Sequence, residues 1–325
     1  MNKREFITLL GGAAAWPLAA RAQQSAMPAI GLLNLVSFES YADRVAVFLQ
    51  GLKEAGFVDG QNVTIDYRSA DGHVERLPDL AADLVRRKVA VIVAIGGDLP
   101  GLAVKEATST IPIVFATGGD PVLAGLVTSF NRPEANVTGV TFYSDKLAGK
   151  RLELLHELWP QARLVAFLTS FNTKTEYFSR EVEAAGRALG VQTVVLHAES
   201  DQDIDTAFAT IVQQGIAALV VSNDSFLNSR RDNIIALAAG DAVPAIYAYR
   251  EHTMAGGLIS YGTEVKEMYR PVGTYTGRIL KGAKPSELPI MQPTKFQLIV
   301  NLKAAKALGL QISDAFLLRA DEVIE

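Results

Sequence analysis

Residues 89–121 read VAVIVAIGGDLPGLAVKEATSTIPIVFATGGDP, and they give the clearest indication of the fold class. It predicts two short apolar strands, Val89–Ile95 and Ile113–Ala116, with a helix over Leu102–Ala107 between them. Each strand is followed within two residues by Gly-Gly-Asp. A strand, a helix and a second strand in close succession are typical of a βαβ unit in a parallel sheet.

The same alternation runs from residue 28 almost to the end of the chain. The other predicted strands are Ala29–Val36, Val63–Arg68, Val137–Thr141, Leu164–Thr169, Gln192–Leu196, Ala218–Val221, Ala245–Tyr247 and Gly257–Tyr261, with an extended stretch at Ile290–Val300. The other predicted helices are Tyr41–Ala55, Leu77–Arg87, Asp120–Phe130, Lys146–Leu158, Thr175–Leu189, Ile204–Gln214, Asn228–Ala239, Glu264–Leu280 and Leu302–Leu308. The pattern predicts an α/β protein with two doubly wound parallel-sheet lobes.

The C-terminal part does not fit two consecutive, independent domains, because each half already has its own sheet. We therefore expect the chain to cross between the lobes near residues 143–145, 261–263 and 284–292, which makes a three-strand hinge. Lobe 1 is predicted to contain residues 28–142 and 263–285. Lobe 2 is predicted to contain residues 143–262 and 286–325.

The composition excludes several classes of protein. Of 325 residues, 31 are Lys or Arg and 35 are Asp or Glu, and the net charge of -4 leaves no basic surplus for binding nucleic acid. There is no cysteine, so disulfides, thiolate metal sites and a cysteine nucleophile are excluded, as is a lipidated N-terminal cysteine.

Residues 1–22 have the pattern of an export signal peptide. Met1–Arg4 carries two positive charges, Phe6–Ala20 is an uncharged apolar run, and Ala20-Arg21-Ala22 fits a cleavage site after Ala22. The run is too short to span a bilayer, so we expect a periplasmic protein that does not cross the membrane. Lys3-Arg4 resembles a twin-arginine export motif in which Lys replaces the first arginine. The sequence therefore leaves open whether export is by the twin-arginine or the general secretory route.

The sequence contains none of the enzyme motifs that this architecture often carries. There is no G-x-S-x-G elbow, no G-x-G-x-x-G after the first strand and no Walker lysine. The four histidines are scattered without metal-ligand spacing. We therefore expect no cofactor, no metal and no catalytic residue.

Polar residues and glycines instead gather at the predicted carboxyl ends of strands, where open α/β sheets bind ligands. The glycine pairs indicate close approach of the backbone to an anion such as a carboxylate. Asp224 would bind an ammonium group, and Phe171 or Tyr249 would contact a ring or an apolar side chain. A zwitterionic amino acid fits this combination. The predicted ligand-binding residues are Ser37, Gly97, Asp98, Thr117, Gly118, Gly119, Asp120, Ser170, Phe171, Asn172, Asn223, Asp224, Tyr247 and Tyr249.

Several motifs also resemble one known family. They are the opening REFITLLGGAAAWPLAARAQ, the run 111–121, NRP at 131–133 with NVTGV at 136–140, SRRD at 229–232, VPAIY at 243–247, QPTKF at 292–296 and the terminal ADEVIE. In this order they resemble the periplasmic substrate-binding proteins of ABC importers, in the tryptophan/tyrosine-binding-like group.

The resemblance implies a type I periplasmic binding fold and an aromatic amino acid, or a related small molecule, between the lobes. It also implies an ABC permease and its ATPase as partners, and we expect a monomer. Asp98 departs from the small neutral or hydroxyl residue expected at its position. An inward-pointing Asp98 would hold an ammonium or amide group instead of a carboxylate.

Two other functions stay open from the sequence. One is a periplasmic α/β enzyme that uses Asp98, Asp120 or Asp224 as acid or base, which would require paired carboxylates with shifted pKa values. The other is a sensory module that reports the bound ligand to a receptor.

Overall fold

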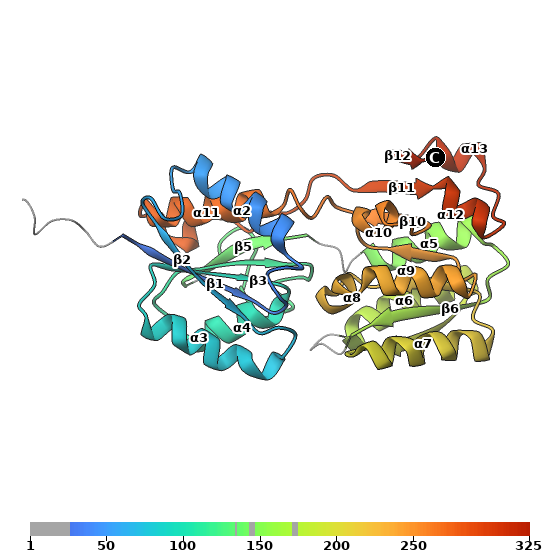
Figure 1. The fold of residues 1–325 in the computed structure, drawn as a ribbon, viewed down its shortest axis with the longest axis horizontal. Coiled ribbons are helices and arrows are strands. Elements are labelled where there is room, and N and C mark those ends of the chain that lie inside the picture. Colours follow the sequence, from blue (N-terminus) through green and yellow to red (C-terminus); the bar gives the residue numbers. More distant parts are fainter. Residues whose placement is uncertain (1–26, 134, 143–146, 171–174) are drawn as a thin grey trace, which may run out of the picture.

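The computed structural model describes the backbone of residues 27–133, 135–142, 147–170 and 175–325. These residues form two α/β lobes that lie side by side (Figure 1). Lobe 1 is built on a five-stranded sheet and lobe 2 on a seven-stranded sheet. The prediction of two α/β lobes with doubly wound sheets is confirmed.

The sheet of lobe 1 is parallel throughout, in the order β2-β1-β3-β4-β5. Its strands are β1 (Ala29–Asn34), β2 (Thr64–Ser69), β3 (Val91–Ile95), β4 (Ile113–Thr117) and β5 (Val137–Thr141). The helices of this lobe are α2 (Ala42–Glu54), the 3-10 helix Val74–Arg76, α3 (Leu77–Arg86), α4 (Asp98–Ala107) and α11 (Tyr269–Leu280). Alternate apolar residues of β3 and β4 enter two separate cores, so helices cover both faces of the sheet.

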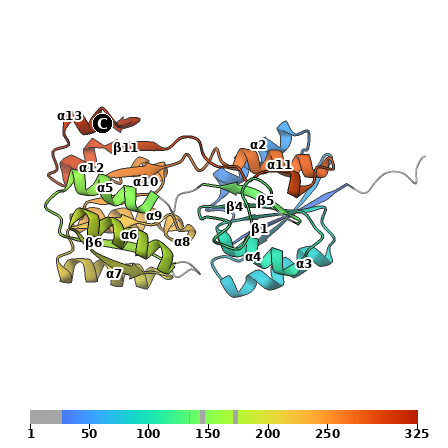
Figure 2. The same cartoon turned by 180° about the vertical axis from the view of Figure 1, so that it is seen from behind.

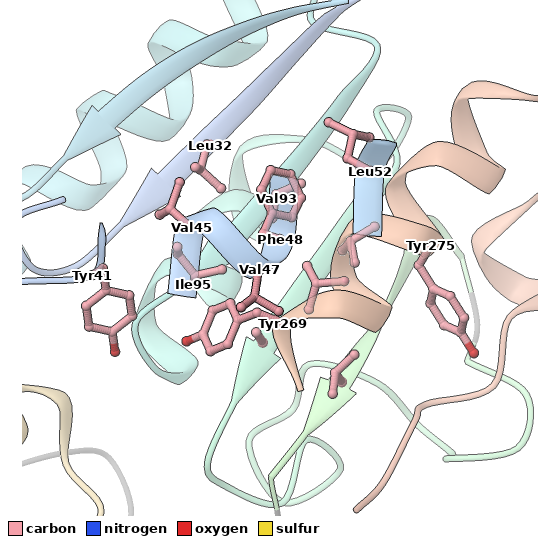
Figure 3. Close-up of a cluster of buried hydrophobic side chains, with 14 of the residues drawn as sticks. Leu32, Tyr41, Val45, Val47, Phe48, Leu52, Val93, Ile95, Tyr269 and Tyr275 are labelled. Atoms are coloured by element: carbon pink, nitrogen blue, oxygen red, sulfur yellow. The ribbon is translucent and has the colours of Figure 1, made fainter. Parts of the chain in front are cut away.

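Helix α11 comes from far along the chain and packs against α2 on one face of this sheet (Figures 1 and 3). The two helices touch backbone to backbone at glycines. A Cβ on Gly51 would lie 2.0 Å from the carbonyl oxygen of Arg270, and one on Gly273 would lie 2.1 Å from that of Phe48. The core around Phe48 and Leu52 therefore depends on two glycines at the helix crossing.

The sheet of lobe 2 has the order β12-β11-β10-β9-β8-β6-β7. It is parallel except where β11 pairs antiparallel with β10. Its strands are β6 (Leu164–Thr169), β7 (Gln192–His197), β8 (Ala218–Val221), β9 (Ala245–Tyr247), β10 (Ile259–Gly262), β11 (Gln297–Asn301) and β12 (Glu322–Ile324).

The helices of lobe 2 cover both faces of its sheet (Figure 2). They are α5 (Ala148–Leu158), α6 (Thr175–Leu189), α7 (Asp201–Gln214), α8 (Ser225–Ser229), α9 (Arg231–Gly240), α10 (Arg250–Met254), α12 (Leu302–Ala307) and α13 (Asp314–Leu317). One core contains Leu152 of α5 and Phe167 of β6. The other contains Phe208 of α7 and Ile234 of α9.

Two of the predicted crossings lie within the described residues. The chain leaves β10 and enters α11 of lobe 1, and it returns before β11 (Figure 1). Within the predicted range 284–292, the chain still binds lobe 1 beyond the 3-10 helix Pro285–Glu287. Ile290 N donates to the Phe130 carbonyl at 2.8 Å, and Met291 N donates to the Gly139 carbonyl at 3.0 Å. The crossing predicted at 143–145 lies outside the described residues.

Several predicted elements differ in the structure. The helix expected at Asp120–Phe130 is a series of turns, in which Gly125 has φ 72°. The helix expected from Glu264 begins only at Tyr269, and Asn228–Ala239 is divided between α8 and α9. Helices α10 and α13 and strand β12 were not predicted. No helix within the described residues is both long and apolar enough to cross a membrane.

Candidate functional site

A cavity of about 90 Å³ lies between the two lobes, next to the carboxyl ends of strands from both sheets. This space holds several water molecules or one small organic molecule. Most of the predicted residues line it. They are Gly97, Asp98, Thr117, Gly118, Gly119, Asn223, Asp224 and Tyr249.

The loop from β3 to α4 brings a carboxylate into the wall of the cavity. Gly96 and Gly97 have φ values of 89° and 114°, which only glycine adopts easily, and the turn places Asp98 in the first turn of α4. The Thr117 hydroxyl donates a hydrogen bond to the Asp98 carboxylate. The second Gly-Gly loop supports this pair, since Gly119 N donates to Thr117 Oγ1 at 3.1 Å.

Gly118 lies where the lobes meet. A Cβ at this position would lie 2.3 Å from Nδ2 of Asn223 and 3.9 Å from the Tyr249 hydroxyl, both in lobe 2. The glycine therefore permits a close approach between lobes. A second contact joins them where the Tyr41 and Ser225 hydroxyls lie 3.0 Å apart. The two lobes consequently touch at two points in the cavity wall.

Asp224 is a buried carboxylate at the start of α8. Its Oδ1 accepts from the amides of Phe226 at 2.7 Å and Leu227 at 3.1 Å, which caps the helix. Its Oδ2 accepts from the Ser170 hydroxyl at 2.6 Å. Burial raises the pKa of Asp224, and the hydrogen bonds only partly oppose this. The carboxylate is thus fixed in position at the cavity.

Tyr249 lines the cavity between β9 and α10, and its hydroxyl donates to the Asn223 carbonyl at 2.6 Å. Its ring lies 6.0 Å from that of His252. Both contacts fix the ring at the cavity wall. Tyr249 therefore lines the cavity, and its contact with a ligand stays a prediction from the sequence.

Arg44 is a cavity residue that the sequence analysis did not identify. It lies in the first turn of α2, is 6% exposed, and its guanidinium lies 4.6 Å from the centroid of the Tyr41 ring. Burial alone would lower the pKa of Arg44, but interactions with Tyr41, Tyr269 and Glu251 outweigh it and raise the pKa. Within the described part of the chain no carboxylate lies in ion-pair contact with Arg44.

A signal for Arg44 was present in the sequence. Arg44 precedes Phe48 by one helical turn, so it lies on the apolar face of a helix whose other residues enter the core. A cation on such a face requires a buried partner or a ligand.

The remaining lining residues supply mainly apolar surface. Aromatic rings come from Tyr41, Phe142, Phe167 and Tyr269, with Leu35 and Val265 beside them. The rings of Phe142 and Tyr269 pack 5.5 Å apart, and Figure 3 shows Tyr41 beside Tyr269. The cavity therefore combines charged groups with flat aromatic walls, which suits a small amphipathic molecule.

Several predicted residues lie outside the cavity wall. Ser37 bonds within its own loop to Ser40, and Asp120 accepts from the amides of Val122 and Leu123 as a turn cap. Tyr247 is 1% exposed and stacks on His252, with ring centroids 4.8 Å apart. Ser170 does not line the cavity but donates to Asp224, which does. Phe171 and Asn172 lie outside the described residues.

The described residues contain no cluster of His, Asp or Glu suited to a metal ion. Asp98 and Asp224 come from different lobes, and Asp120 does not line the cavity. Both carboxylates lie in one cavity between the two lobes.

Comparison with known proteins agrees with this class. The family model described as ABC transporter substrate binding protein matches residues 29–324. The chain therefore belongs to the ABC transporter substrate-binding proteins, and its fold is the type I periplasmic binding fold predicted from the sequence.

Individual relatives are similar over most of their length. A tyrosine-binding protein of Clostridioides difficile (strain R20291) is 26% identical over 285 residues, covering 87% of this chain and 81% of the relative. A conserved domain protein of Vibrio cholerae is 25% identical with a TM-score of 0.84, covering 91% of this chain and 99% of that one. A Streptococcus pneumonia ABC domain in complex with L-Trp is 24% identical with a TM-score of 0.82, covering 92% of this chain and 100% of the other.

Proposed function

We propose that this substrate-binding protein captures an aromatic amino acid between its lobes and delivers it to an ABC permease. Arg44 would bind the carboxylate, and Asp98 and Asp224 would bind the ammonium group. The rings of Tyr249, Tyr269 and their neighbours would enclose the side chain. This assignment replaces the expectation that the glycine loops alone hold the carboxylate.

The observation that carries the proposal is the buried guanidinium of Arg44 in the same cavity as two carboxylates. A buried cation without an ion partner is costly unless a ligand supplies the anion. A zwitterion neutralises this cation and presents an ammonium to the two acids in one molecule. A neutral sugar would leave Arg44 without an anion.

The relatives support an amino acid ligand. The similar protein of Clostridioides difficile is named a tyrosine-binding protein, and the similar structure from Streptococcus pneumonia holds L-Trp. Those ligands are described only for those proteins, but both carry the charged head group and the ring that the proposed site would bind.

The proposed place of action is the periplasm. Residues 1–22 would direct export and be removed after Ala22, and the closed receptor would then bind a permease whose ATPase powers uptake. Closure requires that the ligand bind the closed state better than the open state. No chemical step is required of the chain.

A thermal-shift panel tests the head-group assignment. The mature chain is mixed with L-tyrosine, with tyramine, which lacks the carboxylate, and with 3-(4-hydroxyphenyl)propionate, which lacks the ammonium. L-Tyrosine should raise Tm by several degrees, because a ligand that binds only the native state stabilises it. Both analogues should raise Tm far less. Equal shifts from all three compounds would contradict the assignment.

A further inference from the structure

Two polar side chains of lobe 2 line the cavity, and each has an atom without a hydrogen-bond partner among the described residues. Ser222 follows β8 and is 9% exposed, and Asn228 lies in α8 and is 5% exposed. Neither Ser222 Oγ nor Asn228 Oδ1 has a hydrogen-bond partner among the described residues. Since buried polar groups are nearly always bonded in native proteins, this pair indicates a missing partner within the cavity.

Apolar side chains of lobe 2 line the same cavity as this pair. Phe167 of β6 and Ala148 of α5 belong to the same lobe and line the same cavity. Lobe 2 thus offers an aromatic ring and a small side chain together with two polar atoms that have no hydrogen-bond partner among the described residues. This combination fits a flat ring that carries one hydrogen-bonding group.

The charges of the cavity distinguish this pair from the head-group site. A carboxylate and an ammonium find oppositely charged partners in Arg44, Asp98 and Asp224, and hydrogen bonds between charged groups are stronger than neutral ones. The groups left over, an amide and a hydroxyl, are neutral. They match a neutral polar group, such as a phenol O–H or an indole N–H.

We propose that Ser222 and Asn228 bind the O–H or N–H of the ligand's aromatic side chain, so that the protein selects a phenol or indole ring over a plain phenyl ring. The inference rests on the proposed function, because it assumes that an aromatic amino acid occupies the cavity. A phenyl ring would leave the amide and the hydroxyl buried without a partner, and a site with unpaired polar groups rejects the analogue that cannot pair them.

The test is calorimetric titration with L-tyrosine, L-tryptophan and L-phenylalanine. The wild-type chain should bind tyrosine or tryptophan at least about tenfold more tightly than phenylalanine. Asn228→Leu keeps a similar volume and removes the amide. It should weaken binding of the preferred amino acid about tenfold and change binding of phenylalanine less than about threefold.

Two further variants keep the test interpretable. Asn233→Leu makes the same change at an exposed position of α9 and should leave every affinity unchanged. Ser222→Ala removes only the hydroxyl and should reduce the preference for tyrosine or tryptophan even if Asn228→Leu fails to fold.

Three results would overturn the inference. The wild-type chain could bind all three amino acids equally. Asn228→Leu could weaken all three equally, which would place the amide at the common head group. Both variants could leave the preference unchanged. Failure of the proposed function is distinct, because the wild-type chain would then bind none of the three before any variant is made.

Discussion

At the level of single residues, Arg44 is the buried cation of the cavity. It is buried at the cavity with its guanidinium over the ring of Tyr41, and no carboxylate of the described residues lies in ion-pair contact with it. The charge is therefore available to a ligand.

Replacing Arg44 should remove ligand binding. Arg44→Met keeps the aliphatic stem and deletes the charge, so the ligand carboxylate would be buried without its partner. We expect the affinity for the amino acid to fall at least about 30-fold by calorimetry. Arg86→Met is the matched control, because this side chain of α3 is 69% exposed. Unchanged affinity in Arg44→Met would exclude the carboxylate role.

His252 should make the protein sensitive to acid. Burial, assisted by nearby arginines, lowers its pKa to about 3, whereas the unfolded chain titrates near pH 6.5. Below about pH 6.5 the unfolded state gains a proton that the folded state does not take up. The stability is therefore complete above that pH and is lost progressively as the pH falls toward 3.

The variant His252→Phe tests this dependence. The ring nitrogens of His252 have no hydrogen-bond partner among the described residues, so their loss costs little. Denaturant unfolding at pH 7 and pH 4 should show a smaller loss of stability in the variant than in the wild type. His73→Phe, at an exposed residue, should behave as wild type. If His252→Phe loses as much stability between pH 7 and pH 4 as the wild type does, the acid sensitivity comes from other groups.

At the scale of secondary-structure elements, the loop from β4 is the point where lobe 1 meets lobe 2. Gly118 leaves just enough room for Asn223, and the Tyr41–Ser225 contact lies at the start of α2 and of α8. Loops after strands therefore both line the cavity and hold the lobes together. A bulky side chain at Gly118 should keep the lobes apart.

Gly118→Leu should weaken ligand binding at least about tenfold, because the closed state can no longer form. Small-angle scattering should show no decrease in the radius of gyration when the ligand is added. The same substitution at Gly240 places its Cβ where no atom lies within 4 Å, so Gly240→Leu should close normally. If Gly118→Leu closes on the ligand as Gly240→Leu does, the close approach of Gly118 to Asn223 is not needed for closure.

The elements also show what the sequence could predict and why. Strands β3 and β4 were predictable, because an unbroken apolar run identifies a buried parallel strand. The false helix at Asp120–Phe130 followed from Asp-Pro, which caps a turn as readily as a helix. Strand β12 is three residues long and pairs with β11, so no local sequence pattern predicts it.

The candidate site was predictable to a similar extent. Gly97, Asp98 and Gly118 follow strands, and the rule that open sheets bind ligands at the carboxyl ends of their strands identified them. Arg44 and Tyr269 come from helices of lobe 1, and their place in the cavity depends on how α2 and α11 pack. That packing is a property of the folded chain and not of a local pattern.

At the scale of the whole molecule, the fold links two separate lobes around one cavity. Helix α11 returns to lobe 1 after the sheet of lobe 2 has begun, and the chain then crosses back to β11 (Figure 1). Two crossings within the described residues would allow the lobes to close on a ligand while their relative orientation stays restricted. We propose that ligand binding drives this closure in solution.

The most direct test of the account is a calorimetric titration of the mature chain with L-tyrosine and L-tryptophan. We expect at least one of them to bind at a single site with a dissociation constant in the micromolar range or below, and the binding to be lost in Arg44→Met. The opposite result is that neither amino acid gives a heat of binding or is detected in a competition titration, although the chain is shown to be folded. That result would contradict the claim that this cavity captures an aromatic amino acid.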